Sequence, residues 1–142
     1  MSDTVVDSSV VVKWILPEVD STQAQRLITD IAGAGERLIV LDLVFPEVAN
    51  AIWKRNRNRL ITFGEAQASL ASLARAPVHV ESAIRLLDAA FRIAVQYDRA
   101  VYDALFVALA RDIGVNGVTA DEPLYNAVRA DFPEIVLLRN WP

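Results

Sequence analysis

The chain has 142 residues, of which 54% are hydrophobic and 23% are charged, and these proportions indicate a globular protein rather than a disordered one. It contains no cysteine and one histidine, which excludes disulfides, thiolate nucleophiles and zinc–thiolate sites and nearly excludes histidine-based chemistry. The net charge of -4 argues against a nucleic-acid-binding protein, unless several acids hold a metal ion that reverses the local charge.

Targeting signals are not visible in the sequence. The N-terminus has no basic segment followed by an apolar one, so we expect no secretory signal. No apolar run approaches the roughly 18 residues that a membrane span needs. We therefore expect a soluble, cytoplasmic protein, and at this length one domain over residues 1–142.

Short apolar strands alternate with helices along the chain. The first strand is a β-branched run that stops abruptly at Asp7. Local signals mark the helix boundaries: Pro17 stops the first helix, Thr62 begins a capping box, and Gly114 ends the helix before the fourth strand. In chain order we expect a strand at 4–6, helices at 10–16 and 20–33, a strand at 38–41, helices at 45–59 and 62–75, a strand at 78–80, helices at 82–96 and 102–113, a strand at 117–119, a helix at 121–130 and a strand at 135–138.

Several of these strands are continuous apolar runs, as in a parallel sheet that is covered on both faces. The alternation of strands with helices predicts an α/β fold. We expect a three-layer α/β/α arrangement around a five-stranded parallel sheet.

Four acids share one position in this predicted fold. Asp7 follows the first strand, and Glu47 lies in the first turn of the helix after the second strand. Asp103 lies in the first turn of the helix at 102–113, and Asp121 follows the fourth strand. All four are expected at helix N-termini on the carboxyl edge of the sheet, where open α/β sheets bind ligands. Taken singly, each acid could instead be an ordinary helix cap or a partner of the helix dipole.

Taken together, these acids favour a metal site. Carboxylates that share a small volume cannot all stay ionised without a cation, and Mg²⁺ or Mn²⁺ takes oxygen ligands. Asp103 is the most informative of them, because the seven residues after it are all apolar and predict a buried helix. A carboxylate at the mouth of such a helix is costly unless it is paired or coordinated.

Four segments resemble the signature blocks of PIN-domain proteins, and more closely those of VapC-type toxins of toxin–antitoxin pairs, in order and spacing: V-V-D-S-S-V-V-V-K-W-I-L-P-E, P-E-V-A-N-A-I-W-K, V-Y-D-A-L-F-V-A-L-A and V-T-A-D-E-P-L. The resemblance covers about residues 4–125. It implies a PIN-like fold and a Mg²⁺- or Mn²⁺-dependent endoribonuclease that a cognate antitoxin holds inactive.

The resemblance also assigns roles to residues. The family's acidic positions fall on Asp7, Glu47, Asp103 and Asp121, and its hydroxyl positions fall on Ser9 and Thr119. One or two ions would polarise the scissile phosphate and lower the pKa of a bound water. Asp7 and Asp103 would be direct ligands, Glu47 and Asp121 would bind directly or through water, and the two hydroxyls would orient ligands or waters. Glu-Pro follows Asp121 where some relatives carry another aspartate, which leaves the second ion open.

A basic run closes the helix at 45–59 and consists of Lys54, Arg55, Arg57 and Arg59. It could complement the helix dipole or contact RNA phosphates. We also expect a homodimer. The helix at 62–75 is rich in small residues, which suits close packing at a dimer interface or, equally, in the core.

Three other functions compete with the nuclease. A phosphoacceptor receiver domain needs a lysine near its last strand, and no lysine follows Lys54. A phosphatase of the haloacid dehalogenase type needs a second aspartate at the position that Ser9 occupies. A catalytically silent module that binds RNA or a protein partner is the remaining alternative, although such a module has no need to hold four carboxylates together.

Overall fold

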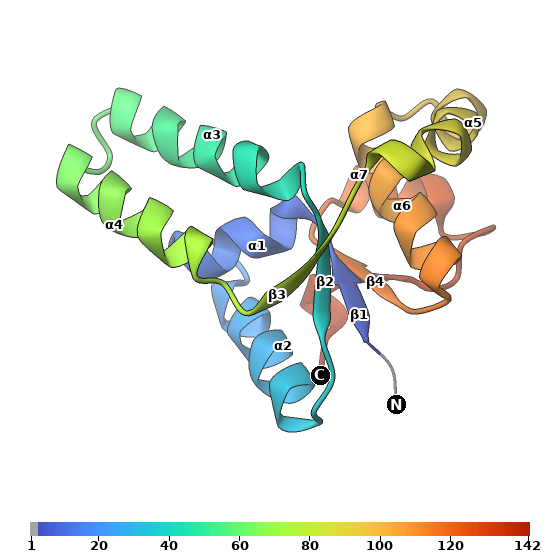
Figure 1. Ribbon diagram of the computed structural model, residues 1–142, viewed down its shortest axis with the longest axis horizontal. Helices are drawn as coiled ribbons and strands as arrows, with labels where there is room; N and C mark the ends of the chain where they lie inside the picture. The colour runs from blue at the N-terminus through green and yellow to red at the C-terminus, as the bar shows by residue number, and fades with distance from the viewer. Residues whose placement is uncertain (1–2) are drawn as a thin grey trace.

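A five-stranded parallel sheet forms the centre of the fold in the computed structural model, which describes residues 3–142 (Figure 1). The strands lie in the order β3-β2-β1-β4-β5. Their bounds are β1 (Thr4–Val6), β2 (Leu38–Leu41), β3 (Val78–Glu81), β4 (Gly117–Thr119) and β5 (Ile135–Leu137). The chain starts at the centre, adds β2 and β3 on one side, and then crosses to β4 and β5. The order in which strands are added therefore reverses between β1 and β4, which makes this the switch point of the sheet. The carboxyl ends of these two parallel strands lie side by side.

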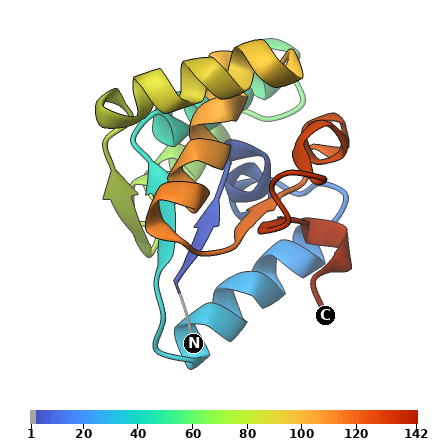
Figure 2. The same ribbon diagram turned by 90° about the vertical axis from the view of Figure 1, so that its right-hand side faces the viewer.

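Helices cover both faces of the sheet, as the sequence predicted (Figures 1 and 2). α1 to α4 pack on one face and α5 to α7 on the other. Figure 2 shows α5 lying across α6 on the outside of the molecule. The helices are α1 (Ser8–Ile15), α2 (Ser21–Gly33), α3 (Val44–Arg57), α4 (Phe63–Ala74), α5 (Leu87–Tyr97), α6 (Val101–Ile113) and α7 (Glu122–Val128), with 3-10 turns η1 (Ile84–Leu86) and η2 (Leu138–Asn140).

Alternating strand residues feed two cores, one on each face. Val5 and Ile39 pack against α5 to α7, whereas Val6 and Val40 pack against α1 to α4. The apolar segment at 104–110 of α6 is buried at every position, which confirms that this helix lies inside the fold. The buried helix fixes the place of Asp103, which lies one residue before that segment.

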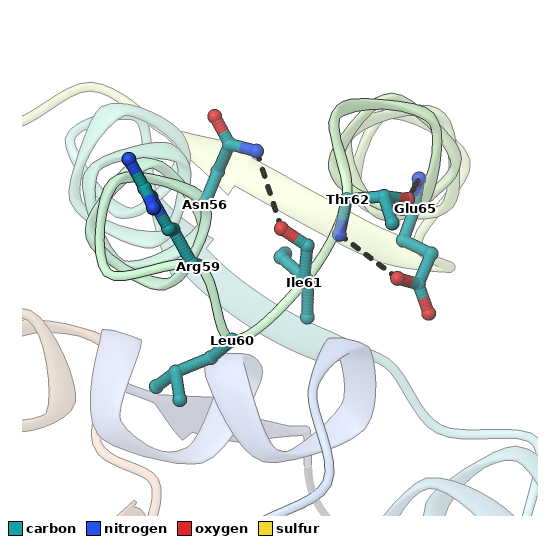
Figure 3. A pocket seen from close by; sticks show the side chains of 6 residues that line it. All are labelled: Asn56, Arg59, Leu60, Ile61, Thr62 and Glu65. Carbon is teal, nitrogen blue, oxygen red and sulfur yellow. Dashed lines mark hydrogen bonds between the residues drawn. The ribbon is translucent and has the colours of Figure 1, made fainter.

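The predicted strands and helices are all present, with shifts at their ends. The first helix begins at Ser8, two residues earlier than expected, because the extended backbone of Asp7 ends β1 and starts α1 at once. The predicted helix at 82–96 divides into η1 and α5. The capping box at Thr62 is confirmed: Thr62 N donates to Glu65 Oε1 at 2.9 Å, and Glu65 N donates to Thr62 Oγ1 at 3.1 Å (Figure 3).

The turn η1 and the helix α5 together bury only one of their two apolar sides. Leu86 and Ala90 face the core, whereas the side chains on the opposite side are exposed, namely Ile84, Leu87, Phe91 and Val95. Among residues 3–142, no helix combines the length and apolar character needed to span a bilayer.

Candidate active site

Asp7 lies where β1 passes into α1 and holds its carboxylate in a fixed orientation. Its backbone takes the N-cap position of α1, but its side chain makes no capping hydrogen bond. Instead, Oδ1 accepts from Ser9 Oγ and Oδ2 accepts from Thr119 Oγ1, both at 2.5 Å. Ordinary helix capping therefore does not account for this carboxylate.

The two hydroxyls join the β1–α1 connection to the β4–α7 connection. Ser9 Oγ accepts from Ala120 N at 2.9 Å, and Thr119 Oγ1 accepts from Asp121 N at 3.1 Å. Thr119 is fully buried. The register explains the meeting, because Val6 pairs with Val118 and the residues after them are consequently neighbours. The structure thus brings Asp7, Ser9, Thr119 and Asp121 together at the switch point.

Three of the four acids line one small pocket. α3 brings Glu47 and α6 brings Asp103, each from its first turn, to the side of Asp7. The pocket has a volume of about 20 Å³, which has room for about one water molecule or one ion. The remaining lining residues are Ser8, Leu41, Leu43, Val44, Tyr102 and Phe106.

Asp121 is nearby but is engaged elsewhere. Its Oδ1 accepts from Leu124 N at 3.0 Å and so caps α7, and the residue is not part of the pocket lining. Among residues 3–142, no three His, Asp or Glu side chains lie close enough to hold one ion in this arrangement. The all-oxygen donor set nevertheless suits a hard divalent cation. Mg²⁺ or Mn²⁺ therefore fits the chemistry of the pocket, although side chains must turn to gather three carboxylates around it.

Burial raises the pKa of each carboxyl group in the pocket. The pKa of Asp7 is raised to about 6, mainly by desolvation, with the hydroxyls of Ser9 and Thr119 acting in the opposite direction. Desolvation is also the largest cause of the raised pKa of Glu47 and of Asp103. No salt bridge within the described part of the chain reaches any of the three.

The basic run lies away from the acids, at the other end of α3. Arg55 is engaged in a salt bridge, because its Nη2 donates to Glu18 Oε2 at 2.9 Å. The guanidinium of Arg57 lies over the Trp53 ring, 5.3 Å from its centroid. Lys54 and Arg59 are exposed, and Figure 3 shows Arg59 beside Leu60 on the turn that leads to α4. The structure thus separates this run from the pocket.

The sequence did not predict that Tyr102 and Asn50 lie beside the acids. Tyr102 is 66% exposed and contributes to the lining of the acid pocket. Its position directly before Asp103, at the start of a helix, is the sequence feature that could have placed it near the acids. Asn50 lies one turn after Glu47, and Glu47 also lines the wider hollow to which Asn50 belongs.

Known proteins with similar sequences and folds were compared with the chain. A family model described as the PIN domain matches residues 4–129. Ribonuclease VapC3 from Pyrobaculum aerophilum is 37% identical over 122 residues, which are 84% of this chain and 90% of that protein.

Two solved structures share the fold. The structure of PAE2754 from Pyrobaculum aerophilum has a TM-score of 0.73 at 22% identity and covers 97% of this chain and 92% of its own. A toxin–antitoxin complex from Klebsiella pneumoniae has a TM-score of 0.68 at 12% identity and covers 95% and 97%. At these identities the two structures support the fold alone.

Proposed function

The chain belongs to the PIN-domain family, and we propose that it is a divalent-metal-dependent endoribonuclease that acts as the toxin of a toxin–antitoxin pair. One observation carries the proposal: Asp7, Glu47 and Asp103 line a single pocket at the switch point of the sheet and form no salt bridge within the described residues. Desolvated carboxylates without a counter-charge are typical of functional sites. The 37% identity to a ribonuclease supplies the reaction class.

Some residues in and beside the pocket would bind the ion, and others would orient its ligands. Asp7 and Asp103 would bind the ion directly, and Glu47 would bind it directly or through water. Ser9 and Thr119 hold the carboxylate of Asp7 in one orientation, which is the usual task of hydroxyls behind metal ligands. Asp121 would join after its carboxylate leaves the N-terminus of α7. When bound, Mg²⁺ or Mn²⁺ supplies polarisation of the scissile phosphate and a water of lowered pKa.

Cleavage of single-stranded RNA tests this function. Wild type with Mg²⁺ or Mn²⁺ is expected to cut the RNA, and excess chelator is expected to stop the cutting. Asp103→Asn, purified in the same way, controls for contaminating nucleases and is expected to be inactive. RNA binding without metal-dependent cleavage by wild type would instead favour the catalytically silent binding module.

We propose that a second copy of the chain docks on the exposed side of α5. The side chains of Ile84, Leu87, Phe91 and Val95 are exposed by 75%, 48%, 62% and 69%. Asp88 and Arg92 pair on the same helix at 3.0 Å, so their two charges offset each other. A two-fold contact places a surface against itself, which a neutral apolar surface tolerates.

We propose that the antitoxin docks on the α3–α4 hairpin. This hairpin exposes Trp53, Leu60, Phe63 and Leu70, and it also carries the basic run. Self-association through it would bring like charges together, whereas an acidic amphipathic segment would complement both the charge and the apolar surface. The proposed RNA contacts of Lys54, Arg57 and Arg59 would then be blocked in the complex.

A reciprocal pair of variants tests both surfaces. Phe91→Glu is expected to give a monomer in analytical ultracentrifugation and to keep antitoxin binding. Phe63→Glu is expected to stay dimeric and to escape inhibition by the antitoxin. A dimeric Phe91→Glu protein, or a Phe63→Glu protein that is still inhibited, would refute the respective assignment.

A further inference from the structure

A second hollow adjoins the acid pocket and has a different chemistry. It has a volume of about 420 Å³ and is lined by Leu43, Pro46, Glu47, Asn50 and Tyr102. Leu43, Glu47 and Tyr102 also line the acid pocket, so the two hollows adjoin each other at these residues. Whatever occupies the larger hollow therefore lies next to the carboxylates.

The walls of this hollow suit a flat, partly apolar group. The Tyr102 ring is 66% exposed, and Leu43 and Pro46 add apolar surface beside it. Asn50 follows Glu47 by three residues on α3, so both present their side chains on the same side of the helix. An amide offers both a donor and an acceptor, which is what the edge of a nucleobase requires.

The charge of this region indicates how a nucleic acid would be held there. Neither the acid pocket nor the adjoining hollow includes a lysine or arginine in its lining. The linings themselves therefore supply no phosphate contact from lysine or arginine, and the chain as a whole has a net charge of -4. Stacking on an aromatic ring does not depend on charge and is available for every base.

We propose that the hollow formed by Leu43, Pro46, Asn50 and Tyr102 binds one unpaired nucleobase of the RNA, next to the phosphate that the acid pocket addresses. The inference rests on the proposed nuclease function and adds a base-binding hollow beside its acid pocket. Tyr102 stacks on the face of the base, and Asn50 reads its edge. A base in a duplex is already stacked and paired, and it cannot enter without being extruded.

Binding of a fluorescein-labelled single-stranded RNA, followed by anisotropy in excess chelator, tests the inference without cleavage. Tyr102→Ala is expected to weaken binding about 5- to 150-fold, which corresponds to the stacking of one base. Tyr102→Phe keeps the ring and is expected to bind within about twofold of wild type. The same sequence in a duplex is expected to bind weakly to all three proteins and without difference between them.

The outcomes separate this inference from the nuclease function. Equal affinity of wild type and Tyr102→Ala for the single strand overturns the base site, even if the protein cuts RNA. Loss of affinity in Tyr102→Ala together with no cleavage by wild type in Mg²⁺ or Mn²⁺ supports the base site and refutes the nuclease. No binding of the single strand by wild type overturns the base site outright. Because Tyr102 is exposed, we expect each variant to melt at the wild-type temperature.

Discussion

Two acids at the amino edge of the sheet, Asp3 and Glu134, are paired with arginine, whereas the three acids of the pocket at the carboxyl edge form no salt bridge within the described residues. Asp3 precedes β1, and its Oδ2 accepts from Arg37 Nη2 at 2.9 Å and Nε at 3.1 Å. Glu134 precedes β5 and accepts from Arg111 Nε at 2.7 Å and Nη2 at 3.1 Å. In the pocket, by contrast, the hydrogen-bond partners of Asp7 are uncharged, since two hydroxyls bind its carboxylate.

The pKa values of these two groups of acids are shifted in opposite directions from their ordinary values. The backbone N–H of Arg37 and then its guanidinium hold the pKa of Asp3 below its ordinary value, and the guanidinium of Arg111 does the same for Glu134. Burial instead raises the pKa of Asp7 and Asp103. Asp3 and Glu134 thus contribute to stability when they are ionised, whereas the ionised acids of the pocket reduce it.

The largest expected effect comes from removing one carboxyl-edge charge. Asp7→Asn is expected to lower RNA cleavage about 10²- to 10³-fold or more, because it removes a charge from the reacting site. The same change leaves the melting temperature of the metal-free protein unchanged or higher, since the charge was desolvated and unpaired. Asp3→Asn is the matched control at the other edge and should lower the melting temperature while cleavage continues. Cleavage by Asp7→Asn at the wild-type rate would refute the mechanism.

The pH dependence of stability should expose the same contrast. The pKa of Asp7 in the folded protein is about 6, against an ordinary value of 3.8. The folded state therefore binds more protons than the unfolded state between about pH 4 and pH 6, and the free energy of unfolding should fall as pH rises through that window. Two pH units of separation correspond to at most about 3 kcal/mol. Glu47 and Asp103 act with the same sign.

Urea unfolding in chelator from pH 4 to pH 7.5 measures this slope. Asp7→Asn should flatten it. The lowered pKa values of Asp3 and Glu134 act in the opposite sense, because their stabilisation is present above the unfolded pKa and is lost as pH falls through the folded pKa. An identical slope for wild type and Asp7→Asn would show that Asp7 is not the source.

A smaller effect is expected from the hydroxyl that holds Asp7. Thr119→Val leaves one oxygen of Asp7 and the N–H of Asp121 without their partner in a buried place. We expect a loss of about 1–3 kcal/mol in the free energy of unfolding. Thr119→Ser keeps the hydroxyl and should retain most of the stability. Equal free energies of unfolding for the valine and serine variants would mean that the hydroxyl of Thr119 contributes nothing to stability.

Much of the fold follows from local signals in the sequence. The capping box at Thr62 and the Gly114 cap mark helix ends through nearest neighbours alone, and both are confirmed. The meeting of Asp7 with Asp103 followed from topology, since buried parallel strands deliver the next helices to the same edge. Asp42 shows that position after a strand is not sufficient to predict a pocket residue. It too follows a strand directly, but its carboxylate accepts a hydrogen bond from Ala83 N and does not line the pocket.

The remaining features depend on contacts between distant residues. Arg55 belonged to a basic run that could complement the helix dipole or contact RNA, yet Glu18, 37 residues away, pairs with it. Ile84 and Phe91 share an apolar side of the helix predicted at 82–96, but spacing does not say which side packs, and the structure buries Ala90 instead. Asp121 is a local case, because its carboxylate caps α7 through Leu124 N, which is the capping alternative that the sequence left open for each acid.

Binding of Mn²⁺ to chelator-stripped protein, measured by isothermal titration calorimetry, tests most directly whether the three acids of the pocket bind a divalent cation. We expect wild type to bind one or two ions per subunit, Asp7→Asn and Asp103→Asn to bind at least about tenfold more weakly, and Asp3→Asn to bind as wild type does. Absence of binding by wild type at millimolar Mn²⁺, or equal binding by all four proteins, would contradict the account.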